Sequence, residues 1–348
     1  MLARAFVCLL LPAAAWCGDW NAAAAAKYLD GRAAEWAAWP RAAKEGGPCV
    51  SCHTTLGYLM ARPALRHGLG ESAPTEFENG LVAGVRVRSA KPPAASTADN
   101  TQAVLAALVL AMDDARRGKG LSKEAEAAFR TMWATQRADG AWGWTDANLE
   151  PWEVPESVYF GAALAAVATG IAPDGYKDRP EIQENLRRLH TYLAENRDRQ
   201  PMANLLVLLW AQNEIHGWQP QQQSFLDEVW RKQSPDGGWM LAALGPWRDR
   251  PNAPPSPGGS NGYATAWTAA MLRLAGVKAD EPHLTRALAW LRAHQTADGS
   301  WDAVSMNHQY PAGSMMEKFM RDATTAYAAL ALADRKEAPH DLLKTKNR

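Results

Sequence analysis

The chain of 348 residues has no net charge, because 37 Lys and Arg residues balance 37 Asp and Glu residues. Nucleic-acid binding and electrostatic attachment to a membrane both draw on an excess of positive charge, so the composition favours neither. Four cysteines are too few for a disulfide framework. The longest apolar run falls well short of the roughly 20 residues that span a bilayer, so no transmembrane span is expected in the mature chain.

Phenylalanine is scarce, with six residues, and the alternating pattern of half-buried strands is almost absent. The 16 tryptophans are numerous by comparison. A hydrophobic content of 47% with 21% charged residues excludes wholesale disorder. These proportions predict an all-α globular protein in which the placement of tryptophan is informative.

The N-terminal residues have the pattern of a secretory signal, with a positive Arg4, an apolar stretch over 5–11 and three alanines before an expected cleavage point. We expect residues 1–17 to be removed, with an approximate boundary, and the protein to be exported, in a bacterium to the periplasm. An uncleaved anchor is an alternative. Lipidation at Cys17 is another, although the preceding Trp16 is larger than a lipoprotein signal requires.

One pattern, Gln-x-x-Asp-Gly-x-Trp, occurs three times, at 136–142, 233–239 and 295–301. Each copy follows an amphipathic helix, which its Asp-Gly pair ends with a turn, and precedes a more apolar helix. The expected amphipathic helices cover 22–28, 121–135, 180–196, 221–232 and 281–294, and the expected apolar helices cover 54–65, 101–112, 156–169, 201–215, 264–275 and 323–333. Apolar helices inside and amphipathic helices outside predict two concentric layers that close into one toroidal domain over 18–348.

The triple motif resembles the QW motif of squalene-hopene cyclases and related terpenoid cyclases, whose fold is an α/α toroid. The resemblance implies that each motif Gln ties a helix end to the next helix start and that each motif Trp stacks on it. Both residues would then be structural. It also implies a family in which cyclisation is started by an Asp of a DxDD motif, and this sequence contains no DxDD.

Other carboxylates were weighed as the missing acid. Asp113 and Asp114 are adjacent, but nearby arginines favour a solvated, salt-paired surface. Glu153 and Glu156 flank the start of an expected apolar helix and are the catalytic candidates. Capping of that helix and compensation of its dipole explain the same two residues without catalysis.

The segment Cys49-Val-Ser-Cys52-His53 is the sharpest chemical signature in the chain. Two thiols at this spacing attach haem c covalently, and the adjacent imidazole of His53 becomes the proximal axial ligand. A chance match is expected only about 0.001 times in this composition. A disulfide or thiol pair and a metal site are the alternatives, although zinc needs more ligands than lie nearby.

A distal ligand has to come from elsewhere in the fold. If the ring closes, the loop over 302–320 lies beside the haem-binding segment, and its candidates are Met306, His308, Met315 and Met316. Filling of core gaps by methionine and a five-coordinate iron are the alternatives.

The leading functional hypothesis is an exported cyclase-like toroid without the cyclase acid, carrying one haem c for electron transfer or redox sensing. Its partner would be an electron-transfer protein or a hydrophobic, isoprenoid-like ligand. The alternatives are a divergent terpenoid cyclase or isoprenoid-processing isomerase, and a noncatalytic toroid that binds a lipid or a partner. Whether the protein is an enzyme stays open at this point.

Overall fold

The computed structural model describes residues 20–90, 96–215, 217–218, 222–247 and 258–333. The expected signal at 1–17 lies outside the described residues. Within them the fold is helical, and the one sheet is a two-stranded ribbon of β1 (Ala43–Lys44) and β2 (Gly47–Pro48), paired antiparallel with Ala43 opposite Pro48. No described helix is long and apolar enough to cross a membrane.

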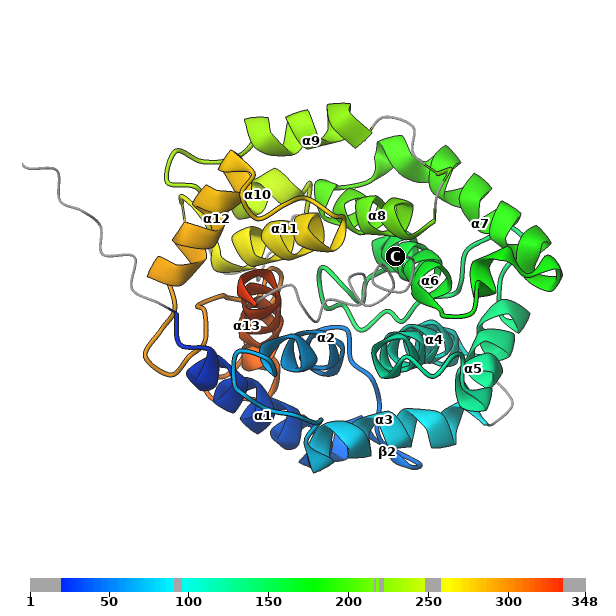
Figure 1. Ribbon diagram of the computed structural model, residues 1–348. Helices are drawn as coiled ribbons and strands as arrows, with labels where there is room; N and C mark the ends of the chain where they lie inside the picture. The colour runs from blue at the N-terminus through cyan, green and yellow to red at the C-terminus, as the bar shows by residue number, and fades with distance from the viewer. Residues whose placement is uncertain (1–19, 91–95, 216, 219–221, 248–257, 334–348) are drawn as a thin grey trace, which may run out of the picture.

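Six helices form an inner layer and six form an outer layer (Figure 1). The inner helices are α2 (Thr55–Leu65), α4 (Thr97–Arg117), α6 (Val158–Ile171), α8 (Met202–Glu214), α11 (Gly262–Leu274) and α13 (Phe319–Leu332). The outer helices are α1 (Ala22–Ala38), α3 (Glu76–Ser89), α5 (Lys123–Ala134), α7 (Gln183–Asn196), α9 (Gln222–Arg231) and α12 (Pro282–Ala293). Smaller elements are α10 (Leu241–Leu244) and the 3-10 turns Pro40–Ala42, Pro155–Ser157, Tyr176–Asp178, Pro180–Ile182, Arg197–Arg199 and Met316–Lys318.

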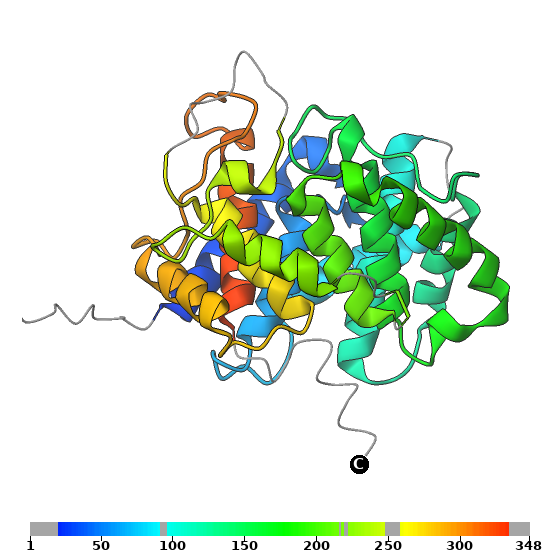
Figure 2. The ribbon, with the colours of Figure 1, turned by 90° about the horizontal axis from the view of Figure 1, so that it is seen from above.

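The ring closes because α13, the last inner helix, packs against α2, the first inner helix, as well as against its neighbour α11. The predicted α/α toroid is therefore confirmed. Long connections precede several inner helices, and the loop before α13 stands at one end of the ring (Figure 2, orange). This end of the ring, where the inner helices begin, is called the loop mouth below.

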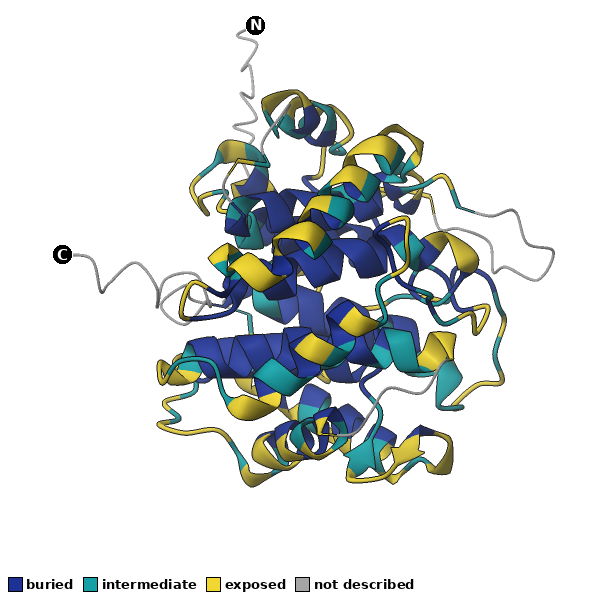
Figure 3. Ribbon diagram, turned by 90° about the vertical axis from the view of Figure 1, so that its right-hand side faces the viewer, coloured by how far each residue is buried: buried dark blue, intermediate teal, exposed yellow. Residues whose placement is uncertain are grey.

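Burial separates the two layers as the hydrophobic pattern predicts (Figure 3). In the inner helix α6, every residue from Tyr159 to Ile171 is buried. The outer helix α12 buries one stripe that includes Leu284, Leu288 and Leu291. Small residues let inner helices approach closely, since a Cβ at Gly57 of α2 would lie 2.8 Å from the Cβ of Ala326 in α13.

Each repeated motif binds the end of the outer helix that precedes it. The indole N–H of the motif Trp donates to a main-chain carbonyl ten residues earlier, and all three indoles are fully buried. The bonds run from Trp142 to Met132 (2.7 Å), from Trp239 to Val229 (3.0 Å) and from Trp301 to Leu291 (2.7 Å). Each acceptor carbonyl lies in the last turn of its helix, where it also accepts a long bond from the main-chain N–H three residues later, so the indole strengthens a weakly bonded helix end.

The motif glutamines tie each outer helix to the start of the next outer helix. Gln136 Nε2 donates to Asn185 O (3.0 Å), Gln233 Nε2 to His283 O (2.8 Å) and Gln295 Nε2 to Asn21 O (3.0 Å). The third bond joins the last outer helix to the N-cap of α1, and Asn21 N donates back to Gln295 Oε1 at 2.7 Å. The motif thus closes the outer layer as well as linking neighbours within it.

The observed helices differ most from the expected ones in three places, and one of these is α4, which covers Thr97–Arg117 where a helix over 101–112 was expected. Helix α1 continues to Ala38, beyond the expected 22–28. Helix α3 was not expected, although Thr75 and Glu78 form a capping box, a signal that the sequence contains. Its amphipathic pattern is weak because Gly80 and Gly84 interrupt it, and Gly84 is required where the main chain of Gly46 passes close by.

Candidate functional site

Side chains from three connections meet at the loop mouth. Cys52, His53 and Thr54 directly precede α2, Glu153 lies in the loop before α6, and Asp322 lies in the first turn of α13. These residues form what we call the mouth cluster. Ring closure brings Thr54 and Asp322 together although 268 residues separate them in the chain.

His53 is 2% exposed and packs between aromatic rings. The ring of Phe319 stacks on it at a centroid distance of 3.7 Å, and Trp36 meets it edge-on at 5.1 Å. Burial lowers the pKa of His53 to about 3, and the positive charge of Arg32 adds to this effect. The imidazole is therefore neutral at physiological pH.

A hydrogen-bond chain determines which nitrogen of His53 carries the proton. Thr54 Oγ1 donates to Asp322 Oδ2 at 2.8 Å, and His53 Nδ1 lies 2.9 Å from the same hydroxyl oxygen. Because the hydroxyl proton is directed at the carboxylate, Nδ1 of His53 is the donor to Thr54. Nε2 is left with its lone pair, the state required of a base or a metal ligand.

Asp322 is the acceptor at the centre of this network. In addition to Thr54, it accepts from Arg32 Nε at 2.7 Å, from Arg32 Nη2 at 3.0 Å and from Tyr28 at 3.1 Å. Burial raises the pKa of the Asp322 carboxyl, and the Arg32 hydrogen bond and charge oppose that rise. The network joins the first outer helix, the first inner helix and the last inner helix.

Glu153 and Cys52 form the other half of the mouth cluster. Glu153 is partly exposed as a residue, but burial of its carboxyl group raises the pKa to about 7, against weaker opposing hydrogen bonds from Cys52. Burial and then Glu153 raise the pKa of the fully buried Cys52 thiol. Cys49 is less buried, and burial raises its pKa as well. Burial thus favours the neutral forms of Glu153, Cys52 and Cys49, as it does for His53.

Two loops cover the cluster. Glu153 N donates to Leu149 O at 2.8 Å, which turns the loop before α6 back on itself. Asn307, in the loop before α13, donates from Nδ2 to Asn148 O at 2.6 Å, and His308 Nε2 lies 3.1 Å from the same oxygen. The loops that precede α6 and α13 therefore meet above the mouth cluster.

A groove of about 1000 Å³ lies beside the cluster, between α1 and residues 297–321. Its aromatic side chains are Tyr28, His308 and Tyr310, and its polar ones include Lys27, Glu35, Ser305, Gln309, Glu317 and Lys318. Arg32 and Tyr28 both line the groove and both bind Asp322, so these two side chains connect the groove to the buried network.

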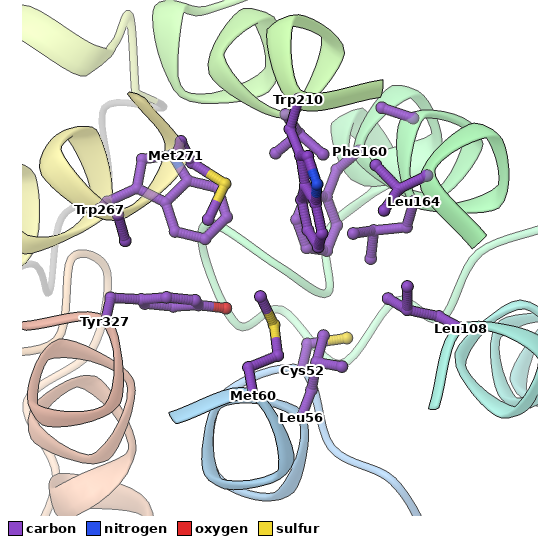
Figure 4. Packing of buried hydrophobic residues seen from close by; sticks show 14 of the residues in the cluster. Cys52, Leu56, Met60, Leu108, Phe160, Leu164, Trp210, Trp267, Met271 and Tyr327 are labelled. Atoms are coloured by element: carbon purple, nitrogen blue, oxygen red, sulfur yellow. The ribbon is translucent and has the colours of Figure 1, made fainter. Parts of the chain in front are cut away.

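The ring centre beneath the mouth is apolar (Figure 4). Tyr327 points towards Met60 there, opposite Trp210 and Trp267, and the sulfur of the neighbouring Cys52 is directed towards Leu108. The binding of a hydrophobic ligand in this region stays a prediction, as does an electron-transfer partner.

The structure places the expected site residues as follows. Cys52 contacts Glu153 and His53 follows it in the chain, whereas Glu156 is exposed and lies outside the cluster. Among the distal candidates, Met306 is buried and His308 contacts Asn148. Met315 Sδ accepts a hydrogen bond from Arg32 Nη2 at 3.1 Å, and Met316 Sδ lies 3.9 Å from Arg41 Nη1. Sequence reasoning missed Thr54, Asp322 and Arg32. Thr54 follows His53 directly in the chain, whereas only ring closure brings Asp322 and Arg32 to this pair.

The adjacent aspartates are salt-paired as expected but are not solvated. Asp113 and Asp114 are 7% and 3% exposed. Arg86 Nη2, from the unexpected helix α3, lies 2.7 Å from Asp113 and 3.0 Å from Asp114. Buried carboxylates that share a guanidinium group hold α3 against α4.

Comparison with known proteins yields a fold and no family. No family model matches the chain, and no curated protein does. Among solved structures, the chain is similar to an inactive variant of an alpha-1,6-mannanase, GH76A of Salegentibacter sp. HEL1_6, in complex with alpha-1,6-mannotetrose. The TM-score is 0.52 at 12% identity, over 89% of this chain and 99% of that chain.

This likeness corrects the expected family. The prediction of a squalene-hopene or terpenoid cyclase relative is wrong, since the matching toroid is a mannanase. The physical reason is that Gln136, Gln233 and Gln295, like the motif tryptophans, bind main-chain carbonyls at helix ends. A ring of helix hairpins can use such a fastening whatever its chemistry, so the motif identifies an architecture and not an activity.

The expected function is corrected with it. The same finding shows that the prediction of a cyclase-like toroid carrying haem for electron transfer or sensing is wrong. The alternative prediction of a divergent cyclase is wrong for the same reason. Among the described residues, no group of three or more His, Cys, Asp or Glu side chains is placed to hold a metal ion. Attachment of haem c to Cys49 and Cys52 is not tested by any contact in the structure and stays a prediction.

Proposed function

We propose that the protein binds an oligosaccharide in the groove beside α1. The observation that carries the proposal is the groove itself, about 1000 Å³ in volume, with Tyr28, His308 and Tyr310 among polar side chains. Flat aromatic rings pack against the apolar faces of sugars, and hydroxyl, amide and charged groups bind sugar hydroxyls. The toroid similar to this one was solved with alpha-1,6-mannotetrose, which makes that tetrasaccharide the first ligand to test.

The charges of the groove favour a neutral sugar. Glu35 is bound by both Arg32 and Lys318, and the whole lining carries four positive and three negative side chains, so its charges nearly balance. Export, which we propose on the strength of residues 1–17, would bring the protein to polysaccharides outside the cytoplasm.

The test is calorimetric titration of the protein with alpha-1,6-mannotetrose, and with cello- and maltotetraose as alternatives. We expect saturable binding of at least one, and a loss of about tenfold or more in Tyr310→Ala, which corresponds to about 1.4 kcal/mol. Tyr192→Ala on the outer helix α7 is the matched control, since Tyr192 is similarly part-exposed and lies outside the groove. Absence of binding to all three sugars, or equal affinity of Tyr310→Ala and wild type, refutes the proposal.

The raised pKa of Glu153 extends the test to hydrolysis. A carboxyl group with a pKa of about 7 is half protonated at neutral pH, as a general acid in glycoside cleavage has to be. Slow release of shorter sugars that disappears in Glu153→Gln, with binding retained, would add hydrolysis to binding. The binding proposal does not depend on that outcome.

A further inference from the structure

The other end of the ring holds a pocket that the proposed function does not use. Helix α2 begins at the mouth cluster and ends at Arg66, which lines a cavity of about 280 Å³ together with residues of α3 and α4. The charged groups around it are Arg66, Arg116, Arg117, Glu78 and Asp113. Three arginines against two carboxylates leave one excess positive charge in a protein whose overall charge is zero.

Both carboxylates are already engaged. Glu78 accepts from Arg66 Nη2 at 2.5 Å and from the main-chain N–H of Thr75 at 2.8 Å. Asp113 binds Arg86 at 2.7 Å and Arg117 Nε at 2.8 Å. The excess charge therefore resides on groups that these two carboxylates do not neutralise.

Two guanidinium groups at the pocket have unused donors. Arg66 is 9% exposed, and its Nε is buried without a hydrogen-bond partner. No hydrogen bond or ion pair joins Arg116 to the described part of the chain. Burial of its guanidinium group lowers the pKa to about 10; the charges of Asp113 and Glu78 oppose this shift, and those of Arg66 and Arg117 add to it. A buried donor without an acceptor costs about 1–3 kcal/mol, more if it is charged.

Attraction of arginines to the C-terminal ends of helices does not explain why these guanidinium donors lack acceptors. The C-terminal ends of α2 and α4 carry partial negative charge, which attracts arginines in general. That attraction does not provide an acceptor for Arg66 Nε. The N-terminus of α3, whose Pro74, Glu78 and Asn79 border the pocket, instead contributes partial positive charge.

We propose that this pocket binds a small oxyanion, a carboxylate or phosphate group, between Arg66 and Arg116. The anion supplies the acceptors that both guanidinium groups lack and offsets the excess positive charge. Leu59, Pro63 and Val82 in the lining provide room for a short apolar body attached to the anionic group. The pocket size limits the ligand to a small molecule or a terminal group.

The test uses inorganic phosphate and succinate as probes, with mannose as the neutral comparison. We expect phosphate, succinate or both to bind saturably, to raise the thermal midpoint and to bind more weakly as chloride is added. Arg116→Gln should weaken binding at least tenfold and abolish the midpoint shift, whereas Arg116→Lys should keep part of both. Arg187→Gln is the control, since Arg187 is an exposed arginine on α7 far from the pocket lining.

The variants also report on the free protein. Without ligand, Arg116→Gln should unfold at the same temperature as wild type or higher, because it removes a partly buried charge that no ion pair in the described part of the chain compensates. Binding of neither probe, or an equal midpoint shift in wild type and Arg116→Gln, overturns the proposal. The oligosaccharide proposal is unaffected by either result, because its groove shares no residue with this pocket.

Discussion

Burial acts in opposite directions on the pKa values of two titratable groups of the mouth cluster. It raises the pKa of Glu153 to about 7 and lowers that of His53 to about 3. Both shifts favour the uncharged form, because each group loses hydration that its charge would need. At pH 5 to 6 the Cys52 thiol, the His53 imidazole and most of the Glu153 carboxyl are neutral, so the mouth cluster is uncharged apart from the Asp322–Arg32 pair.

The Glu153 shift makes a prediction about pH and stability. The pKa of the Glu153 carboxyl is about 4.3 in the unfolded chain and about 7 in the native protein. Between these two values the native protein retains a proton that the unfolded protein has lost. The stabilisation is therefore complete below pH 4.3 and is lost as pH rises through 7. The free energy of unfolding of Glu153→Gln, relative to that of wild type, should rise by up to about 3 kcal/mol between pH 4 and pH 8. Urea unfolding at a series of pH values measures this difference.

A matched control lies three residues away. Glu156→Gln removes an exposed carboxyl from the same loop, and its stability should follow wild type at every pH. Parallel pH profiles for Glu153→Gln and wild type would show that Glu153 titrates normally and would remove the basis for a general-acid role.

At the scale of elements, the repeated motif fastens helices through a glycine as well as through Gln and Trp. Gly299 has a φ of +89°, and a Cβ there would overlap the main chain of Ala24 in α1. Gly140 and Gly237 occupy the same position against α7 and α12, with φ of +94° and +96°. Each motif glycine therefore meets two requirements, a left-handed conformation and close approach to the next outer helix.

Alanine at these glycines separates the two requirements. Gly70→Ala tests the conformation alone, because Gly70 has a φ of +69° with open space around it, and it should cost about 1 kcal/mol. Gly299→Ala adds the overlap with α1 and should cost about 3 kcal/mol or more in urea unfolding. Hydrogen exchange of α1 should accelerate in Gly299→Ala and not in Gly70→Ala. Equal costs for the two variants would contradict the packing role of the motif glycine.

At the scale of the whole molecule, the ring is held shut by contacts between its first and last helices. The Arg32–Asp322 pair is buried, with side chains 5% and 1% exposed, and joins α1 to α13. The Asn21–Gln295 bonds close the outer layer at the N-terminus of α1. Loss of one partner from a buried ion pair leaves the other as an uncompensated charge in the interior.

Ring closure can be tested through that pair. Asp322→Ala should destabilise the protein by about 3–5 kcal/mol, because Arg32 and Tyr28 lose their shared acceptor. The double variant Arg32→Met/Asp322→Leu should recover a large part of this loss, since neither charge remains buried. Urea unfolding of the single and double variants gives the comparison. A double variant as unstable as the sum of the two single ones would mean that the pair is not coupled.

The local pattern of the chain was enough to predict most of the helices. The three motifs and the hydrophobic periodicity locate α5, α9 and α12 to within two residues at each end. Helix α3 escaped because Gly80 and Gly84 weaken its periodicity. The pairing of Cys52 with Glu153 had no sequence signal, since the two residues meet only when the loops before α2 and α6 converge.

The sequence by itself determined the layers, because helix periodicity and the Gln-x-x-Asp-Gly-x-Trp staples depend on residues close together along the chain. Tertiary structure alone decided which chemistry-bearing side chains meet. His53 reaches Asp322 through Thr54 only after the ring has closed, and Arg66 and Arg116 line one pocket only after α2, α3 and α4 have packed together. These contacts join residues that are far apart in the chain, which local sequence patterns cannot relate. Burial then sets the protonation of His53 and Glu153 at the loop mouth. At the opposite end it leaves Arg66 Nε without a hydrogen-bond partner.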